Sequence, residues 1–176
     1  RITRLRDAAE CAVYTPGSRA GHPVSVLRAF DPPPAAIMED PDLLRDRIQA
    51  TATSLLALMG IAADPITSRE HILLANILEC AWSEGRTLDL AGIIQAIQTP
   101  PFERIGVLDL DMFFPAKDRM ALALRLNNLL AAPGFEAWME GPPLDIGRLL
   151  YTPEGQPRAS IFTVSHLGET QRMFFV

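Results

Sequence analysis

The pattern of apolar and polar positions along the chain predicts a helical middle between two short strand regions. Cys11–Thr15 is a run of β-prone residues that ends at a Pro-Gly-Ser turn, so we expect a strand there. Ser160–Ser165 is a second such run and predicts a strand buried on both faces, because Ile161, Phe162 and Val164 fall on both of its sides. A shorter run, Val24–Leu27, predicts a further short strand.

The first helix of the middle region is predicted to begin at Asp40, which is a good N-cap before a proline at the first helical position. Asp64 and Pro65 are expected to end it. Between these limits, apolar residues recur at a spacing of three and four, as on one face of a helix. They are Leu44, Ile48, Ala52, Leu55, Met59 and Ala62.

The second helix is predicted to open with a capping box. In that motif the hydroxyl of Thr67 and the carboxylate of Glu70 each accept a hydrogen bond from a free backbone amide of the first turn. Gly85 is the expected C-terminal cap. The apolar stripe between them comprises Leu74, Ile77, Leu78, Ala81 and Trp82.

Further helices follow toward the C-terminus. Asp89 is the expected cap of a short helix that stops at Thr99, and Pro115 opens a fourth helix that runs to Leu130. A short helix is predicted over Phe135–Glu140, and the first turns of another over Glu169–Val176. The apolar positions of the short helix after Asp89 are Leu90, Ile93, Ile94 and Ile97.

Composition places the chain among globular proteins. Of its 176 residues, 48% are hydrophobic and 21% are charged, which suits one domain or a piece of one. The formal charge of −5 argues against an open basic surface for nucleic acid or anionic lipid. Two cysteines are too few for a disulfide scaffold, and no signal peptide or membrane-spanning run is visible, so we expect a cytoplasmic protein.

The two ends of the sequence are unusual. The chain begins at Arg1 without a methionine, and it stops at the apolar run Met173–Val176. Chain ends are normally exposed, so an apolar end predicts a segment cut from a longer protein. Its function is then not contained in these residues alone.

No phosphate-binding loop is found in the sequence. Such a loop needs two glycines at fixed spacing and a lysine that reaches the outer phosphates, whereas Gly17–His22 has another spacing and the only lysine is Lys117. Ile105–Asp111 resembles a Walker B strand, in which an apolar run presents an acid to Mg²⁺. The simpler interpretation is a buried turn in which Asp109 or Asp111 accepts amide hydrogen bonds.

The histidines and cysteines do not predict a site. His22, His71 and His166 lack metal-ligand spacing, and His71 is expected to be solvated in the first turn of its helix. Ser165 and His166 end a predicted strand, where α/β proteins often place active-site groups. Neighbours on a strand point to opposite faces, so these two are not a nucleophile and its base. Cys11 and Cys80 are predicted to be small core residues.

Aromatic residues and arginines offer two further candidates. Aromatic rings can stack on bases, but those in this chain lie on or beside amphipathic helices without interleaved basic residues, so core packing is favoured. Arg158 and Arg172 flank the last strand, where a guanidinium can reach a neighbouring subunit's phosphates; an ordinary surface arginine is the simpler interpretation. From the residues we therefore assign no catalytic, cofactor-binding or metal-binding position. The aromatic residues considered are Trp82, Trp138, Phe113, Phe114 and Phe135.

Several long stretches taken together resemble a known family. They are Cys11–Ser18, Pro100–Pro115, Pro143–Pro153, Pro157–Leu167 and Gln171–Val176. In these stretches the chain resembles a bacterial branch of the HerA/FtsK-like P-loop ATPases, the ATP-binding proteins with a helicase HerA-type domain. The similarity covers nearly the whole chain.

The resemblance implies a place in a parent protein, between a Walker A motif upstream and a Walker B motif downstream. It implies three regions: a core strand region of a RecA-like ATPase (1–31), a helical insert (32–143), and a core strand with the start of the next helix (144–176). The Asp109/Asp111 run then belongs to the insert, and no known catalytic residue of the family falls on these positions. The implied parent is a homo-hexameric DNA helicase or translocase that uses ATP and Mg²⁺ and acts on double-stranded DNA.

The predicted fold class is mixed α/β and mainly helical, with partial RecA-like core strands and a large helical insert. If so, the strands at 11–15 and 160–165 run parallel in one sheet, although about 145 residues separate them. The alternative is a helical protein-interaction module without catalytic activity, in which the two strands lie apart. A stand-alone hydrolase has no supporting set of residues.

Overall fold

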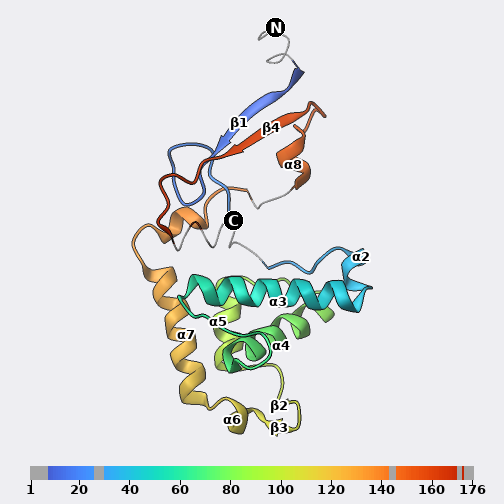
Figure 1. Ribbon diagram of the computed structural model, residues 1–176, viewed down its shortest axis with the longest axis vertical. Helices are drawn as coiled ribbons and strands as arrows, with labels where there is room; N and C mark the ends of the chain where they lie inside the picture. The colour runs from blue at the N-terminus through green and yellow to red at the C-terminus, as the bar shows by residue number, and fades with distance from the viewer. Residues whose placement is uncertain (1–7, 26–29, 143–145, 170–171, 173–176) are drawn as a thin grey trace. The chain divides into compact units, whose positions relative to one another are not determined.

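The computed structural model describes residues 8–25, 30–142, 146–169 and 172 (Figure 1). The fold is mixed α/β and mainly helical, as predicted, with a small parallel sheet. The chain divides into two compact units, one from residues 1–28 and 132–175 and the other essentially from 29–131. Among the described residues, no helix has the length and apolar character needed to cross a bilayer.

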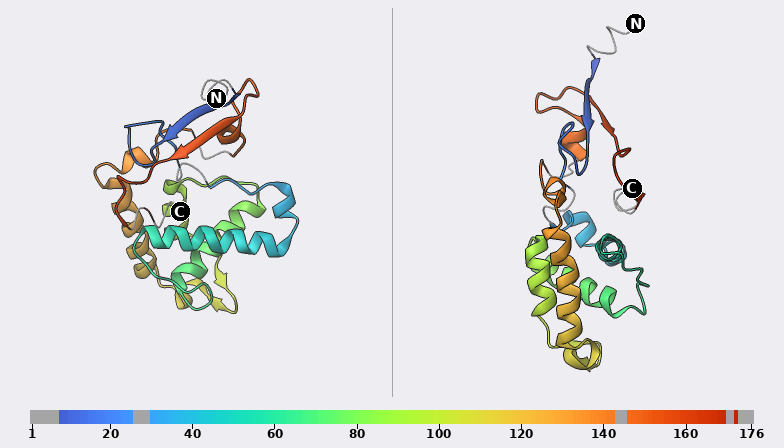
Figure 2. Two further views of the ribbon diagram at one scale, coloured as in Figure 1. Left: turned by 45° about the horizontal axis from the view of Figure 1, so that its top comes forward. Right: turned by 90° about the vertical axis from the view of Figure 1, so that its left-hand side faces the viewer.

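The first unit, which we call the sheet unit, is built on two strands. β1 (Glu10–Tyr14) and β4 (Arg158–Phe162) pair in parallel, from Glu10 opposite Arg158 to Tyr14 opposite Phe162 (Figures 1 and 2). The predicted parallel pairing is therefore confirmed. β4 ends at Phe162 rather than Ser165, because the chain turns at once: the Leu167 N–H donates to the Val164 carbonyl.

Among the described residues, packing covers one face of this sheet. Tyr14 stacks on Phe162 with ring centroids 5.2 Å apart, and Ala12 and Val24 complete a small core that Leu149 of α8 (Ile146–Leu150) flanks. On the other face Val13 is 44% exposed and Ile161 is 52% exposed. The expectation that the last strand is buried on both faces is wrong, since in the described residues packing reaches only the Tyr14 side.

Two further expectations about the sheet unit need correction. Cys11 is exposed on β1 rather than in the core, and Cys80, of the other unit, is half-buried. Val24 is buried but lies in no strand; next to it the Ser25 N–H donates to the Pro142 carbonyl. The rest of the predicted Val24–Leu27 strand lies outside the described residues.

The second unit, the helical unit, packs α3 against α4 and α5 against both α4 and α7. The predicted stripes form its core: Ile48 and Leu55 of α3 are buried, as is every predicted position of α4. Leu44 and Met59, at the two ends of the α3 stripe, are only half-buried. The elements are α2 (Ala35–Met38), α3 (Pro41–Leu58), α4 (Arg69–Ser83), α5 (Leu90–Gln98), β2 (Arg104–Ile105), β3 (Leu108–Asp109), α6 (Leu110–Phe113) and α7 (Ala116–Ala131).

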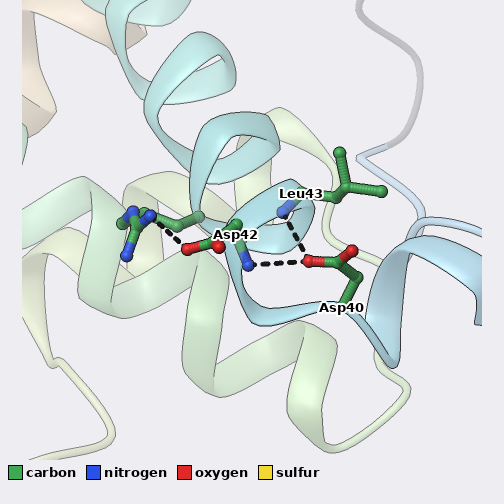
Figure 3. A network of polar contacts seen from close by, with 4 residues as sticks. Asp40, Asp42 and Leu43 are labelled. Atoms are coloured by element: carbon green, nitrogen blue, oxygen red, sulfur yellow. Dashed lines mark hydrogen bonds and ion pairs between the residues drawn. The ribbon is translucent and has the colours of Figure 1, made fainter.

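The start of α3 follows the prediction. The Asp40 carboxylate accepts hydrogen bonds from the backbone N–H groups of Asp42 and Leu43, at 3.0 and 3.2 Å (Figure 3). These amides have no partner inside the helix, so the N-cap satisfies two of the four free donors. Asp89 caps α5 in the same way, through the Gly92 N–H at 2.7 Å.

The end of α3 differs from the prediction. The helix stops at Leu58, before Ala62 and Asp64, because Gly60 adopts the left-handed conformation with φ 70°. The Gly60 N–H bonds to the Ala57 carbonyl and the Ile61 N–H to the Leu56 carbonyl, both at 2.9 Å. This is the Schellman arrangement. Gly85 ends α4 with the same pair of bonds, as predicted.

The predicted capping box at α4 is also wrong. Thr67 does not cap the helix; its N–H and hydroxyl both donate to the Asp64 carboxylate, which also accepts from the Ile66 N–H. The Ser68 hydroxyl, at the N-cap position, donates to the Glu70 carboxylate instead of accepting from an amide. The hydrogen bonds from Thr67 and Ile66 hold the pKa of Asp64 below its ordinary value.

The remaining helices follow their predictions in outline. α7 begins just after Pro115 and ends at Ala131, and a 3-10 helix, η1 (Phe135–Trp138), occupies the predicted short helix. The helical unit ends at Ala131, so η1 packs with the sheet unit. Of the last predicted helix, the Arg172 N–H donates to the Gly168 carbonyl, as in a first helical turn; residues 170–171 and 173–176 lie outside the described part.

Candidate functional site

The carboxyl ends of β1 and β4 carry the candidate site. In parallel sheets these ends meet at one edge, and ligands commonly bind just beyond it. The segment 15–22 follows β1, and 163–168 follows β4. Together they bring hydroxyl and imidazole groups to one edge, which we call the carboxyl edge. The side chains in question are those of Thr15, Ser18, His22, Thr163, Ser165 and His166.

The segment after β1 is a closed loop. The Thr15 hydroxyl donates to the Ser18 carbonyl at 3.1 Å and accepts from the Gly21 N–H at 2.9 Å. The Thr15 N–H donates to the His22 carbonyl, and the His22 N–H returns to the Val13 carbonyl, both at 3.0 Å. The loop amides are thus used inside the loop, which differs from a nest of free amides that cradles a phosphate.

His166 ties the two segments together. Its Nε2 atom lies 2.8 Å from the Pro16 carbonyl oxygen. A carbonyl oxygen only accepts hydrogen bonds, so Nε2 is the donor in this contact. Nearby, the Thr163 and Ser165 hydroxyls lie 3.3 Å apart. The edge therefore offers hydroxyl groups and an imidazole, and among the described residues no hydroxyl there is hydrogen-bonded to a basic side chain.

The segment 132–142 packs closely against the loop 15–22 that follows β1. Gly17 has φ 66°, and a Cβ atom there would lie 2.5 Å from the Trp138 ring. A Cβ on Gly141 would lie 2.4 Å from the Pro23 carbonyl oxygen. Arg19 also pairs with Glu140, and this contact raises the pKa of Arg19 and lowers that of Glu140. We call this segment the clasp.

The two candidate arginines are engaged elsewhere. Arg158 lies at the amino end of β4, away from the carboxyl edge, where it pairs with Glu10 at 3.1 Å and donates to the Arg148 carbonyl. Arg172 donates through Nε to the Leu167 carbonyl at 3.0 Å.

The candidate aromatic residues are mostly core residues. Trp82, Trp138, Phe114 and Phe135 are buried, and Phe113 is half-buried. The Trp82 indole donates to the Phe30 carbonyl at 3.1 Å. Arg69 lies over the Phe114 ring at 5.1 Å. Core packing, favoured from the sequence, is confirmed for the four buried rings.

The run that resembles Walker B folds back on itself. β2 and β3 form a small antiparallel hairpin that turns at Gly106 and Val107. Asp109 and Asp111 are exposed, so the interpretation as a buried turn is wrong. Their partners are also guanidinium groups rather than amides: Arg104 at 3.4 Å and Arg119 at 2.7 Å.

The burial of two polar residues was not predicted from the sequence. His71 is 1% exposed rather than solvated; its Nε2 lies 3.1 Å from the Thr53 hydroxyl and 3.3 Å from the Gln49 carbonyl oxygen. Arg119 is buried on α7 and donates to both the Phe114 carbonyl and Asp111. The spacing of residues along the chain does not predict the burial of either side chain, because that burial depends on which element packs against its helix.

A cleft in the helical unit is the second candidate. It has a volume of about 490 Å³ and lies between α4, α5 and the turn at Arg86. Ile77, Ala81 and Leu88 give it an apolar floor, and Gln95, Gln98 and Thr99 line its polar side. The guanidinium of Arg86 is already bonded to Glu84 at 2.5 Å, so no free charge converges on the cleft.

Comparisons with known proteins give no match: no family model, no curated protein and no solved structure is similar to this chain. Within the described residues, no three His, Cys, Asp or Glu side chains gather as a metal site requires. Function is therefore argued from the chain's own residues.

Proposed function

We propose that this chain is an internal segment of a HerA/FtsK-like ATPase whose parent couples ATP hydrolysis to DNA translocation or unwinding. The observation that carries the proposal is the parallel pairing of β1 with β4. Parallel neighbours require a crossover connection, and here the whole helical unit lies within it. This is the arrangement expected of two RecA-like core strands that flank an insert.

The carboxyl edge supports the same proposal. In open α/β sheets this edge is where ligands bind. His166 and Pro16 hold the two post-strand segments together there. In the parent, ATP and Mg²⁺ supply the hydrolytic chemistry and are bound through residues outside this chain. The chain itself positions the segments 15–22 and 163–168 and holds the His166 imidazole at this edge through its contact with Pro16.

The second candidate function is a helical protein-interaction module without chemistry. It is favoured by exposed apolar side chains on the helical unit, of which Val107 is 84% exposed and Met112 is 72% exposed. The two functions are compatible in one parent, since an insert can bind a partner while the core hydrolyses ATP.

The sequence encoded upstream and downstream of this chain in its reading frame distinguishes the two proposed functions. The motor proposal expects a Gly-x-x-x-x-Gly-Lys-Ser/Thr motif shortly upstream of Arg1 and an apolar strand ending in an acid downstream of Val176. A frame without the upstream motif would overturn the motor and leave the interaction module. Calorimetry on the 176-residue chain with ATP and Mg²⁺ is the companion test. We expect no heat of binding, and micromolar binding would contradict the proposed division of labour.

A further inference from the structure

Exposed apolar side chains are concentrated on one stretch of the helical unit. Of the twelve large hydrophobic residues that are exposed in the described chain, five fall between positions 107 and 124. Isolated exposed hydrophobics are ordinary, whereas a local concentration of them marks an interaction surface. The five are Val107, Leu108, Met112, Met120 and Leu124.

The first part of this stretch is acidic, and we call it the hairpin patch. It comprises the β2–β3 hairpin and α6, with Val107 and Met112 as its most exposed apolar side chains. Three carboxylates, those of Glu103, Asp109 and Asp111, accompany a single exposed guanidinium, that of Arg104. Arg104 pairs with Asp109, and buried Arg119 pairs with Asp111. In the described part of the chain, Glu103 has no ion pair.

The second part is basic and lies on α7; we call it the α7 stripe. It comprises Lys117, Met120, Leu124 and Arg125, which the helical repeat places on one side of α7. The buried residues of α7, such as Leu122 and Leu126, lie on the opposite side and face the core. Neither Lys117 nor Arg125 makes an ion pair with any described residue.

We propose that the occupant of this surface is a second copy of the chain, with the hairpin patch of one copy against the α7 stripe of the other. Each surface has exposed apolar side chains at its centre and unneutralised charge beside them, and the two charges are opposite. Opposite charges select the partner and apolar contact supplies the affinity. DNA fits less well, since its phosphates could match only the basic α7 stripe and would leave the acidic hairpin patch without a partner.

The contact joins unlike surfaces, and this restricts the assemblies that form. Repetition of such a contact gives a reciprocal pair, in which each copy contributes both surfaces, a closed ring, or an open filament. The inference does not rest on the ATPase proposal. If the chain self-associates but has no ATPase parent, this inference stands and the proposed function fails. If an ATPase parent exists but its insert stays monomeric, the proposed function stands and this inference fails.

Sedimentation of the 176-residue chain over micromolar to submillimolar concentration, at low and high salt, tests the proposal. We expect association that rises with concentration and weakens in high salt. Leu124→Glu places a carboxylate in the α7 stripe and is expected to weaken association about tenfold or more. Leu43→Glu is the matched control, because Leu43 on α3 is 50% exposed and Leu124 is 52% exposed. A chain that is monomeric at every concentration, or variants that behave alike, would overturn the proposal.

A charge exchange tests the pairing of the two surfaces. Glu103→Lys and Arg125→Glu each place like charges in the contact, so each is expected to weaken association, whereas the double variant restores opposite charges and recovers it. Both residues are exposed and form no ion pair with described residues, and circular dichroism checks that each variant is folded. A double variant that associates no better than either single variant would overturn the assigned pairing.

Discussion

The His166 Nε2 atom lies 2.8 Å from the carbonyl oxygen of Pro16, a residue 150 positions earlier in the sequence. This hydrogen bond closes the carboxyl edge of the β1–β4 pair, since each residue belongs to the segment that follows one strand. It also directs the Nε2 atom of His166 toward the loop that follows β1. The bond therefore makes the two segments one structural site.

Removal of this bond is expected to loosen the carboxyl edge. His166→Ala leaves the Pro16 carbonyl without its partner, so we expect the sheet unit to lose about 1 kcal/mol of stability. Chemical denaturation followed by Trp138 fluorescence, in a Trp82→Phe background, measures the loss. Ser165→Ala is the control, because Ser165 is exposed and its side chain hydrogen-bonds, within the described part of the chain, only to the Thr163 hydroxyl. Equal losses in both variants would contradict the role given to His166.

Gly17 offers a test of the clasp. An alanine there is strained by the positive φ, which costs about 1–2 kcal/mol, and its methyl group would overlap the Trp138 ring. We expect Gly17→Ala to destabilise the sheet unit by more than Gly155→Ala does. Gly155 also has a positive φ, of 82°, but faces open space. Urea denaturation of both variants compares strain alone with strain plus steric overlap, and equal effects would argue against tight packing of η1 on the loop.

Asp64 predicts a pH dependence of the helical unit. Its pKa is lowered in the folded chain by hydrogen bonds from Thr67 and Ile66. A carboxyl with a lowered pKa stabilises the fold above its unfolded pKa, and this contribution disappears as the pH falls through the folded pKa. Wild type should therefore exceed Asp64→Asn in stability at pH 7, with a difference that shrinks below about pH 4.

Thermal unfolding between pH 7 and pH 3 measures this difference. Asp46→Asn serves as the control, because Asp46 is exposed on α3 and makes no side-chain hydrogen bond with described residues. A wild-type advantage over Asp64→Asn that stays constant with pH would contradict the assignment.

The two compact units are expected to respond separately to core mutations. Leu126 is fully buried between α7 and the rest of the helical unit, so Leu126→Ala should cost that unit about 2–5 kcal/mol. Trp82 reports the helical unit and Trp138 the sheet unit, which allows each transition to be followed in a single-tryptophan variant. We expect only the Trp82 transition to move. Leu43→Ala, at an exposed site, should move neither, and a shift of both transitions by Leu126→Ala would show that the units unfold together.

Local sequence signals located most of the helices. Asp40, Asp89 and Gly85 cap helices because each acts through its own backbone neighbours, which the sequence displays directly. Gly60 is also a glycine that can end a helix. The helical spacing of apolar residues continued through Ala62, so the helix was predicted to extend beyond Gly60. Asp64 took the place of Thr67 because an aspartate before a proline binds the next turn's amides as readily as a capping box does.

Features that depend on distant packing could not be read from the sequence. His71 and Arg119 are buried because another element packs over them, and spacing within their own helices carries no record of this. The parallel pairing of β1 and β4 was predicted only through the family resemblance, since no local rule joins strands so far apart. The apolar pattern of the last strand overstated the covering of Ile161, which is exposed. Of the candidate site, the sequence indicated Ser165 and His166, but not the partner of His166 at Pro16.

ATP hydrolysis by the proposed parent protein, measured with and without double-stranded DNA, is the decisive test of the proposed function. We predict hydrolysis that DNA stimulates and that substitution of the expected upstream phosphate-loop lysine abolishes. His166→Ala should reduce it, whereas Ser165→Ala should leave it largely intact. A parent that shows no hydrolysis in the presence or absence of DNA, although it is folded, would contradict the proposed function.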